Sequence, residues 1–267
     1  PGRSNHRYDA SSFDEIDPLL GGNKAMEDFS KAAHQSGLRI MGDLTTNHCG
    51  AGHPWIQKAI KNSRSKTRDF FYWDSKIRHG YVGWWGLASL PKLNYTSKKL
   101  RGLMYSDRNS VIRKWLKAPY SFDGWRIDVG NMTGRYLDQD INQEVARGIR
   151  DAMDETNPNA WLVAENADHS PSDLDGFGWH GTMNYNGFAR PVVNWLNKPK
   201  KNIPNFSQFS VPNPTFSGNG TVKAMRAFAA GIPWRSFVAS MVLLDSHDTA
   251  RFKTIVGGDR SRHLAGV

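Results

Sequence analysis

Short apolar runs alternate with amphipathic segments along most of the chain. The apolar runs of strand length lie at residues 38–43, 122–129, 161–165, 181–185 and 241–244. Apolar residues recur at helical spacing in the segments between or after them, at residues 23–36, 109–117, 138–156, 188–196 and 222–230. Strands that alternate with helices in this way predict a parallel sheet covered by helices. We therefore expect an α/β fold.

Two stretches depart from this alternation. Residues 1–22 are rich in Gly, Ser, Asn, Asp and Pro, which predicts loop structure. Residues 49–106 are too long for a plain connection and are rich in aromatic residues, which predicts an inserted subdomain. Most of these aromatic side chains are expected to fill the core of the insert, although aromatic faces also suit stacking on sugar rings.

The run at 122–129 places two opposite charges on one face of a predicted strand. Alternate residues of a strand share a face, so Arg126 and Asp128 lie opposite to Trp125 and Ile127. Buried charges are costly unless they are paired. We therefore expect Arg126 to pair with Asp128 and to lower the pKa of that carboxyl. Such a pair has either a structural or a catalytic role, and the pair alone favours neither.

Polar side chains follow four of the predicted strands. They are Asp43, Asn47 and His48, then Arg126 and Asp128, then Glu165, and finally His247 and Asp248. Functional groups at the carboxyl ends of parallel strands are typical of the (β/α)8 barrel. A doubly wound sheet also binds ligands there, but usually with a Gly-rich phosphate-binding turn that this sequence lacks. We interpret Asp43 and Asn47 as structural, with Asp43 bonded to the backbone.

Three carboxylates from three strands favour acid/base and nucleophilic chemistry without a metal, because no cysteine cluster or His-Glu-x-x-His pattern accompanies them. Hydrolysis of a glycosidic bond uses such a set. Asp128 suits the nucleophile, and Glu165 suits the acid/base because burial after an apolar strand favours the protonated form. Asp248 suits stabilisation of the transition state. Glu165 could instead form a salt bridge, and His48 and His247 could bind sugar hydroxyls, cap helices or lie in the core.

The chain resembles the α-amylase family, glycoside hydrolase family 13, in four short motifs that stand in the family's order. They are Asp43-Leu-Thr-Thr-Asn47-His48, Gly124-Trp-Arg126-Ile-Asp128, Glu165 after an apolar strand, and Ser246-His247-Asp248. Any one of these motifs is weak, but all four in order are specific. Leu90-Pro91-Lys92-Leu93-Asn94 and Thr182-Met183-Asn184-Tyr185 further resemble the neopullulanase, cyclomaltodextrinase and maltogenic amylase group.

The resemblance implies a (β/α)8 TIM barrel, incomplete in this chain, with an inserted B domain after the third strand. Residues 1–48 would supply the loop after strand 2, a helix and strand 3 of the barrel. Residues 49–106 would form the B domain, and residues 107–267 would supply strands 4 to 7. On this basis we expect a segment of a longer polypeptide that folds poorly in isolation, because missing strands leave unpaired edges.

The resemblance also implies a function and the residues that perform it. The implied function is a retaining hydrolase or transglycosylase that cleaves α-1,4 and often α-1,6 glucosidic bonds in cyclodextrins, pullulan or maltooligosaccharides. The implied catalytic residues are the nucleophile Asp128, the acid/base Glu165 and the transition-state stabiliser Asp248. The residues implied to bind the sugar are Tyr8, Asp9, His48, Arg126, His247 and Arg251. Among these, Tyr8 would stack on the sugar ring and Asp9 would pair with Arg251.

Two segments depart from the pattern of the group, and both neighbour the acceptor side of the cleaved bond. The group usually has Trp-His shortly after the acid/base Glu, where this chain has Asn166-Ala-Asp168-His169. It usually has Ala-Asn-Glu after the nucleophile, where this chain has Gly130-Asn131-Met132. The preference between hydrolysis and transfer therefore stays open.

Two other functions compete with this interpretation. A non-catalytic α-glucan-binding relative would be indicated by loss of one of the three carboxylates, all of which are present. A polyanion-binding protein would account for the net charge of +10, but the basic residues are scattered and no nucleic-acid-binding motif accompanies them. We therefore expect an α-glucan partner and no nucleic acid.

Composition restricts the expected partners, cellular location and cofactors of the protein. No run is apolar enough to span a membrane, so we expect no membrane partner. A single cysteine, Cys49, excludes an internal disulfide framework and, with no visible targeting segment, favours the cytoplasm. We expect no cofactor for the chemistry and no metal at the site residues. The resemblance leaves room for a structural calcium ion with ligands outside this segment, and for a homodimer of the full-length protein.

Overall fold

The computed structural model describes residues 1–166, 171–198 and 214–267, which form two compact units. Unit 1 comprises residues 1–165 and 177–179, and unit 2 comprises residues 166–176 and 180–267. None of the helices in these described ranges is long and apolar enough to cross a membrane.

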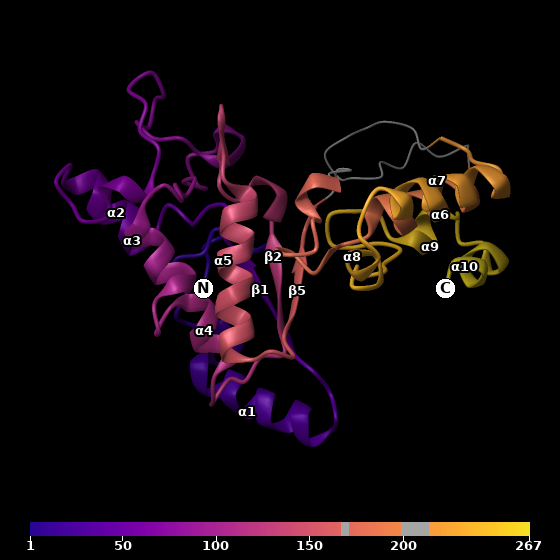
Figure 1. Cartoon of the computed structure of the whole chain (residues 1–267), viewed down its shortest axis with the longest axis horizontal. Coiled ribbons are helices and arrows are strands. Elements are labelled where there is room, and N and C mark those ends of the chain that lie inside the picture. The colour runs from indigo at the N-terminus through magenta and orange to yellow at the C-terminus, as the bar shows by residue number, and fades with distance from the viewer. Residues whose placement is uncertain (167–170, 199–213) are drawn as a thin grey trace. The chain divides into compact units, whose positions relative to one another are not determined.

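Unit 1 is built on a parallel sheet, as the alternation of strands and helices predicts. Its strands are β1 (Met41–Thr45), β2 (Gly124–Asp128) and β5 (Trp161–Ala164), and β2 lies between the other two (Figure 1). The register pairs Asp43 with Arg126 and Thr45 with Asp128. The segment that follows β1 therefore leaves the sheet at the same edge as Asp128.

Strand β2 is buried along its whole length, and glycines allow its neighbours to approach closely. A Cβ on Gly124 would lie 2.4 Å from the Trp161 carbonyl oxygen, and a Cβ on Gly42 would lie 2.4 Å from the Trp125 ring. Trp125 and Ile127 are almost completely buried on one face of the strand. The other face carries Arg126 and Asp128, whose side chains contact each other.

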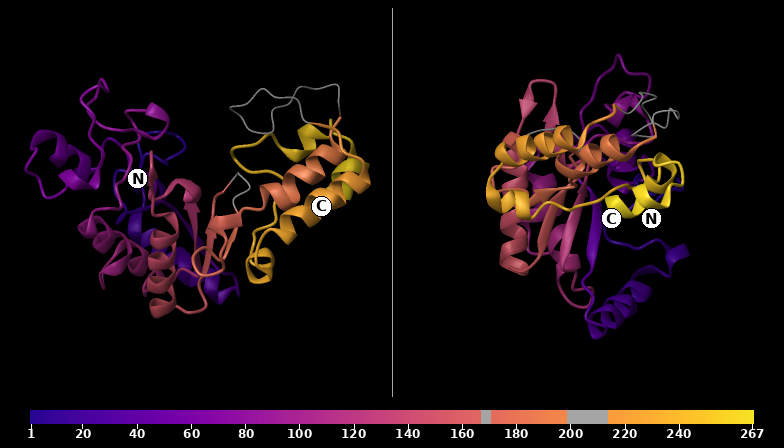
Figure 2. Two further views of the ribbon diagram at one scale, coloured as in Figure 1. Left: turned by 45° about the horizontal axis from the view of Figure 1, so that its top comes forward. Right: turned by 90° about the vertical axis from the view of Figure 1, so that its right-hand side faces the viewer.

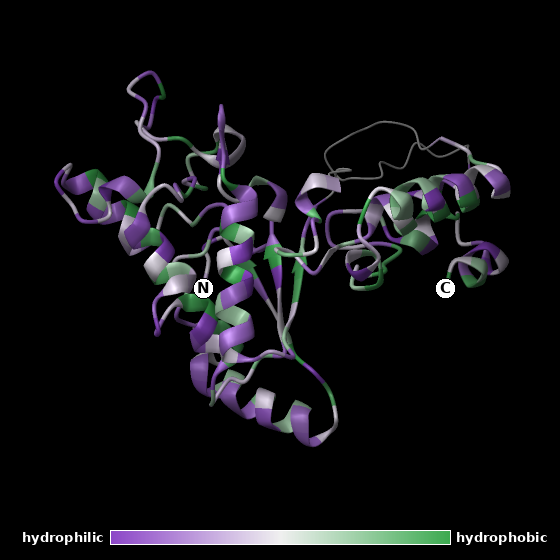
Figure 3. Cartoon of the chain, in the orientation of Figure 1, coloured by the Kyte–Doolittle hydropathy of each residue, from purple (hydrophilic) through white to green (hydrophobic). Residues whose placement is uncertain are grey.

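Three helices of unit 1 were expected from helical spacing. They are α1 (Gly22–Gln35), α4 (Val111–Leu116) and α5 (Asn142–Thr156), and α5 runs alongside the strands in Figure 1. Hydrophobic and hydrophilic residues alternate along α5 at helical spacing (Figure 3), and Val145, Ile149 and Met153 are buried. The predicted start at residue 138 was wrong, because β3 (Arg135–Tyr136) and β4 (Gln139–Asp140) form a hairpin there, which turns at Leu137 with φ 50°.

The aromatic segment at 49–106 contains short helices linked by isolated bridges. The helices are α2 (Pro54–Lys61), η2 (Arg68–Phe70), η3 (Trp84–Gly86), α3 (Lys98–Arg101) and the π-turn η4 (Gly102–Ser106). Phe70, Phe71, Leu93 and Tyr95 are buried together with the rest of its apolar core. Five of the ten Trp, Tyr and Phe residues of this segment are buried and fill a core, whereas Trp85 is 60% exposed.

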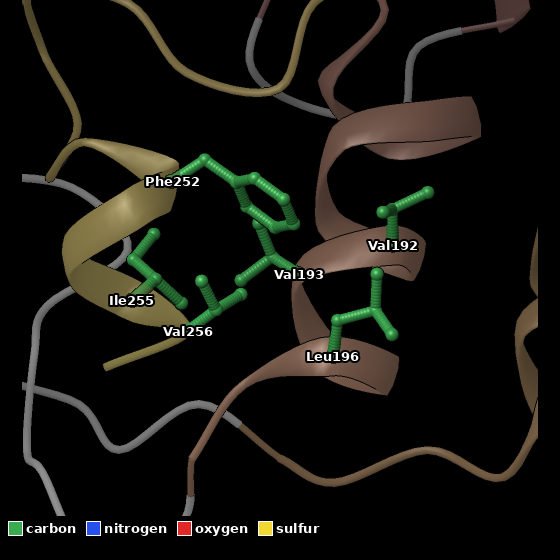
Figure 4. Packing of buried hydrophobic residues seen from close by; sticks show 6 residues of the cluster. All are labelled: Val192, Val193, Leu196, Phe252, Ile255 and Val256. Atoms are coloured by element: carbon green, nitrogen blue, oxygen red, sulfur yellow. The ribbon is translucent and has the colours of Figure 1, made fainter. Parts of the chain in front are cut away.

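Unit 2 is mainly helical. Its elements are β6 (Gly181–Thr182), the π-turn η7 (Tyr185–Ala189), α6 (Arg190–Leu196), α7 (Gly218–Ala230), α8 (Trp234–Val238), α9 (Phe252–Ile255) and α10 (Arg260–Gly266). Figure 4 shows its core, in which side chains of α6 and α9 face each other. That cluster consists of Val192, Val193, Leu196, Phe252, Ile255 and Val256.

The strand predicted at 241–244 is not formed in the described part of unit 2. Among the described residues, Met241 alone pairs, by a parallel bridge with Met183, and Val242 is 61% exposed. An apolar run becomes a strand only where a neighbouring strand supplies partners for its backbone N–H and C=O groups. The described residues supply such partners to Met241 alone, through the carbonyl of Thr182 and the N–H of Asn184.

Candidate active site

Three carboxylates, one on β1, one on β2 and one directly after β5, meet at the guanidinium of Arg126. Nη1 donates to Asp43 Oδ1 at 2.8 Å and to Asp128 Oδ1 at 3.1 Å, and Nη2 lies 3.0 Å from Glu165 Oε2. Arg126 itself is 6% exposed. Burial opposes its charge, but Asp43, Glu165 and Asp128 outweigh burial and raise the pKa of Arg126. The guanidinium therefore stays charged and holds the carboxylates in one place.

Asp43 belongs to this cluster, and its expected role in bonding to the backbone was wrong. The parallel register sets Asp43 beside Arg126, which donates to both of its carboxylate oxygens. The Tyr8 hydroxyl also donates to Asp43 Oδ2 at 2.8 Å, and the Tyr8 ring centroid lies 5.6 Å from Arg126 Cζ. Burial and the Asp43 carboxylate raise the pKa of Tyr8, so this hydroxyl keeps its proton. Only the register between β1 and β2 could have revealed this role.

The expected lowering of the Asp128 pKa was also wrong. Burial and the nearby Glu165 carboxylate raise the pKa of Asp128 to about 8, although Arg126 acts in the opposite direction. The cost of burial is large because the side chain of Asp128 is 8% exposed. Asp128 therefore retains its proton at neutral pH in the ligand-free site.

The raised pKa predicts an unusual pH dependence of stability. The pKa of Asp128 is about 8 in the folded protein and about 3.9 in an unfolded chain. Between these values the folded state binds more protons than the unfolded state, so this group makes the free energy of unfolding fall as pH rises, by up to about 1.4 kcal/mol per pH unit. We expect Asp128→Asn, which does not titrate, to gain stability relative to the wild type from pH 4 to pH 8 in denaturant titrations. A difference between the two proteins that is independent of pH would contradict the raised pKa.

Glu165 is positioned by the residue that follows Asp128. Val129 has φ 48° and ψ 41°, a left-handed conformation that is strained for a β-branched residue. This conformation directs the Val129 N–H to Glu165 Oε2, at 2.9 Å. The backbone N–H of Glu165 in turn donates to the Ile127 carbonyl at 2.8 Å. Backbone strain is concentrated at functional sites, where the surrounding structure maintains it.

The glycine at position 130, the first residue of the departing segment Gly130-Asn131-Met132, has a steric reason. These residues form a 3-10 turn, η5, and a Cβ on Gly130 would lie 2.8 Å from the Cβ of Ala164. The alanine that is usual in the group would therefore require a shift of β5 or of the turn. Asn142 Nδ2 stabilises the turn by donating to the Gly130 and Thr133 carbonyls, each at 2.8 Å.

The second departure lies only partly within the described residues. Asn166 is buried and donates through Nδ2 to Asp173 Oδ2 at 3.0 Å, within unit 2. Asp173 belongs to the short 3-10 turn η6 (Pro171–Asp173). Ala167, Asp168 and His169 lie outside the described residues.

His48 and Asn47 reach the site from the segment that follows β1. His48 is 2% exposed, and its Nε2 lies 4.0 Å from Asp128 Oδ2 without a hydrogen-bond partner among the residues that the structure describes. Burial and then the charge of Lys92 lower the pKa of His48 to about 4, so the imidazole is neutral at pH 7. A neutral, buried ring nitrogen beside a carboxylate is suited to hydrogen bonding with a ligand hydroxyl. Asn47 Nδ2 contacts His48 Nδ1 at 3.2 Å.

Lys92 is a site residue that the sequence indicated only as part of a motif. It is 3% exposed, and its Nζ donates to Asn47 Oδ1 and, at 3.1 Å, to the Met132 carbonyl. Burial lowers the pKa of Lys92 to about 7. Lys92 thus ties the segment after β1 to the turn after β2. A lysine in a predicted insert gives no sequence signal of such a contact.

Asp9 lies in unit 1, and three other predicted residues lie in unit 2. Asp9 accepts hydrogen bonds from the backbone N–H groups of Arg3 and Ser4. In unit 2, His247 Nε2 lies 3.4 Å from Asp248 Oδ2, and the Asp248 N–H donates to Ser246 Oγ. Arg251 donates to Asp245 Oδ1 at 2.8 Å. The pairing of Asp9 with Arg251 and the meeting of Asp248 with Asp128 stay predictions.

Unit 1 therefore brings together a set of groups that suits acid/base and nucleophilic chemistry. The set consists of Tyr8, Asp43, His48, Arg126, Asp128 and Glu165. It offers carboxylates with one retained proton, a fixed positive charge and a neutral imidazole. Within residues 1–166, 171–198 and 214–267, no group of three or more His, Cys, Asp and Glu side chains is arranged to hold a metal ion.

Comparison with known proteins connects this geometry to a family. The family model "Alpha amylase, catalytic domain" matches residues 2–266. An amylopullulanase of Thermoanaerobacter thermohydrosulfuricus is 28% identical over 283 residues, covering 95% of this chain and 18% of the relative. A cyclomaltodextrinase of Geobacillus thermopakistaniensis is 26% identical and covers 96% of this chain and 40% of the relative. The solved structure of the Nostoc punctiforme debranching enzyme has a TM-score of 0.84 at 26% identity, covering 99% of this chain and 54% of that one.

The chain thus spans less than half the length of these curated relatives and about half of the solved structure. The match nevertheless extends over almost every residue of the chain itself. On this ground the chain belongs to the alpha-amylase family, whose catalytic-domain model it matches.

Proposed function

We propose that the protein containing this chain is a retaining glycoside hydrolase that cleaves α-glucosidic bonds through a covalent glycosyl-enzyme intermediate. The observation that carries the proposal is the contact of Asp128 and Glu165 with the single guanidinium of Arg126. Retaining enzymes place their two carboxyl groups only about 5–5.5 Å apart, whereas inverting enzymes need about 6.5–9.5 Å to admit a water molecule. Two carboxylates that share one guanidinium favour the short separation.

The proposed roles follow from the surroundings of each group. Asp128 attacks the anomeric carbon in its ionised form, while Glu165 donates a proton to the leaving oxygen. Arg126 favours the ionised form of Asp128 by donating to Oδ1. Glu165 then removes a proton from the water that hydrolyses the intermediate. We assign Asp248 to stabilisation of the transition state, and Tyr8, Asp9, His48, Arg126, His247 and Arg251 to binding of the sugar.

The names of the relatives support an α-glucan as the substrate. They include amylopullulanases, cyclomaltodextrinases, a debranching enzyme and a cyclic α-maltosyl-(1→6)-maltose hydrolase. We propose cyclodextrins, pullulan and maltooligosaccharides as substrates, with cleavage of α-1,4 and α-1,6 bonds. One relative is named an intracellular maltogenic amylase, which supports a cytoplasmic location for this protein as well.

We also propose the family's architecture for the full-length protein. Residues 49–106 would be the B domain, inserted after the third strand of a (β/α)8 barrel, and residues 1–48 and 107–267 would be barrel segments. The parallel order of β1, β2 and β5 supports this arrangement. A homodimer stays a prediction.

Product analysis of the full-length protein tests the proposal. We expect turnover of β-cyclodextrin, pullulan or maltotriose, with the first product formed in the α configuration when the reaction is followed by proton NMR. First products in the β configuration would contradict the retaining mechanism and show an inverting one. Binding of these glucans without any turnover would favour the alternative, a non-catalytic glucan-binding relative, although Asp128, Glu165 and Asp248 are all present.

A further inference from the structure

Two adjacent tryptophans in unit 1 form an exposed aromatic surface that the proposed chemistry does not use. The rings of Trp84 and Trp85 stack with centroids 5.3 Å apart and an interplanar angle of 21°. Trp85 is 60% exposed, and Trp84 is half-buried. Most other aromatic residues of the same segment lie in its core, so this pair needs a separate explanation.

The exposed Trp85 has a strained backbone conformation. Trp85 has φ 52° and ψ 26°, a conformation in which a bulky residue is an outlier. The turn around it is tight, because a Cβ on the preceding Gly83 would lie 2.0 Å from the Leu87 carbonyl oxygen. Residues with strained backbone conformations cluster at active sites and ligand contacts.

A chain of contacts joins the tryptophan pair to the candidate active site. The Trp84 ring centroid lies 5.7 Å from Lys92 Nζ, and Lys92 Nζ donates to Asn47. Asn47 contacts His48, whose Nε2 lies 4.0 Å from Asp128. Backbone pairing follows the same route, since Gly83 bridges to Pro91 and Lys92 bridges to His48. The pair is therefore part of the structure that carries His48.

We propose that Trp84 and Trp85 form a stacking platform for an α-glucan segment that extends beyond the sugar bound at the candidate active site. This inference rests on the proposed function. The apolar faces of glucose rings pack on exposed indole rings, and tryptophan presents a large rigid surface for such packing. The occupant is a maltooligosaccharide long enough to reach from Asp128 to Trp85. A short substrate gains nothing from the platform.

Turnover of long and short substrates by the full-length protein tests this platform. We expect Trp85→Ala to lower kcat/KM for maltoheptaose about 10-fold, the size of one aromatic contact, while kcat/KM for maltotriose stays within twofold. In an Asp128→Asn background, the same change should raise the Kd of maltoheptaose measured by calorimetry. The matched control is Trp234→Ala, because Trp234 is 73% exposed on helix α8 of unit 2. The control should leave kcat/KM for maltoheptaose and maltotriose, and the Kd of maltoheptaose, unchanged.

Trp85→Gly separates loss of the ring from damage to the fold. Glycine adopts the left-handed conformation without strain. We therefore expect the same loss on maltoheptaose as for Trp85→Ala, with a thermal midpoint equal to or above that of the wild type. Equal losses on maltoheptaose and maltotriose, or no loss on either, would overturn the platform. A wild-type protein that cleaves neither substrate would instead overturn the proposed function, and the Kd comparison would still decide about the platform.

Discussion

Replacing Asp128 by Asn, or Glu165 by Gln, in the full-length protein is expected to lower kcat by on the order of 10³-fold or more. A positioned acid/base group contributes about 10²- to 10⁴-fold, and loss of a nucleophile removes the covalent route altogether. Both side chains are largely buried, with exposures of 8% for Asp128 and 14% for Glu165. An amide of the same shape keeps the packing around either position.

The fold should survive both changes for a specific reason. Burial and Glu165 raise the pKa of Asp128 to about 8, so the neutral amide of Asn resembles the protonated carboxyl at pH 7. Gln at position 165 retains an oxygen that can accept from the Val129 N–H. We expect circular dichroism spectra and thermal midpoints close to those of the wild type.

Two carboxylates on the surface provide matched controls for these measurements. Asp154 pairs with Arg150 on helix α5, and Glu155 pairs with Arg113, with side-chain exposures of 42% and 67%. Asp154→Asn and Glu155→Gln should leave kcat within twofold of the wild type. Activity near the wild-type level in both Asp128→Asn and Glu165→Gln would refute the proposed mechanism.

Replacing Arg126 by Met is expected to abolish activity and to cost about 3–5 kcal/mol in the free energy of unfolding. Removal of one partner from a buried ion pair leaves the other charge without compensation. Here the change removes the positive charge that faces Asp43, Asp128 and Glu165 together. The repulsion between these carboxylates then opposes folding at neutral pH.

Denaturant titrations of Arg126→Met at several pH values measure this cost. We expect the loss of stability to shrink as pH falls toward 4, because protonation of the carboxylates removes their mutual repulsion. Arg150→Met is the control, since Arg150 and Asp154 form an i,i+4 pair at the surface, where such a pair contributes about 0.3–0.5 kcal/mol. A similar, pH-independent loss in both variants would show that Arg126 has only an ordinary packing role.

Arg126→Lys distinguishes charge from geometry. Lysine keeps the positive charge but lacks the planar fork that reaches several carboxylates at once. We expect it to recover part of the lost stability and little of the activity, because it cannot hold Asp128 and Glu165 in the same arrangement.

Residue patterns predicted the parts of the fold that depend on local periodicity. Helical spacing identified α1 and α4 within one or two residues, and apolar runs identified β2 and β5. The prediction of a strand at residues 241–244 was wrong, because a strand forms only where a neighbouring strand pairs with its backbone. Residues 242–244 are as apolar as the run in β5, yet in the described part of unit 2 the backbone pairing ends at Met241.

The candidate active site likewise contains residues that the sequence identified and residues whose role only the tertiary structure reveals. The order of short motifs was enough to single out Asp128, Glu165, His48 and Arg126, because the chemistry demands those residue types at strand ends. The role of Asp43 depends on a register that pairs it with Arg126 across 83 residues of sequence. The role of Lys92 depends on an insert that returns to the turn after β2.

The sequence by itself determined the family, the α/β alternation and the chemical types of the groups at the site. Tertiary structure alone decided the charge state of Asp128. Arg126 is two residues away in sequence and predicts a lowered pKa, but burial and a carboxylate from the neighbouring strand act more strongly in the opposite direction. Desolvation and the approach of Glu165 arise only when β2 and β5 lie side by side in the sheet, and no local pattern contains them.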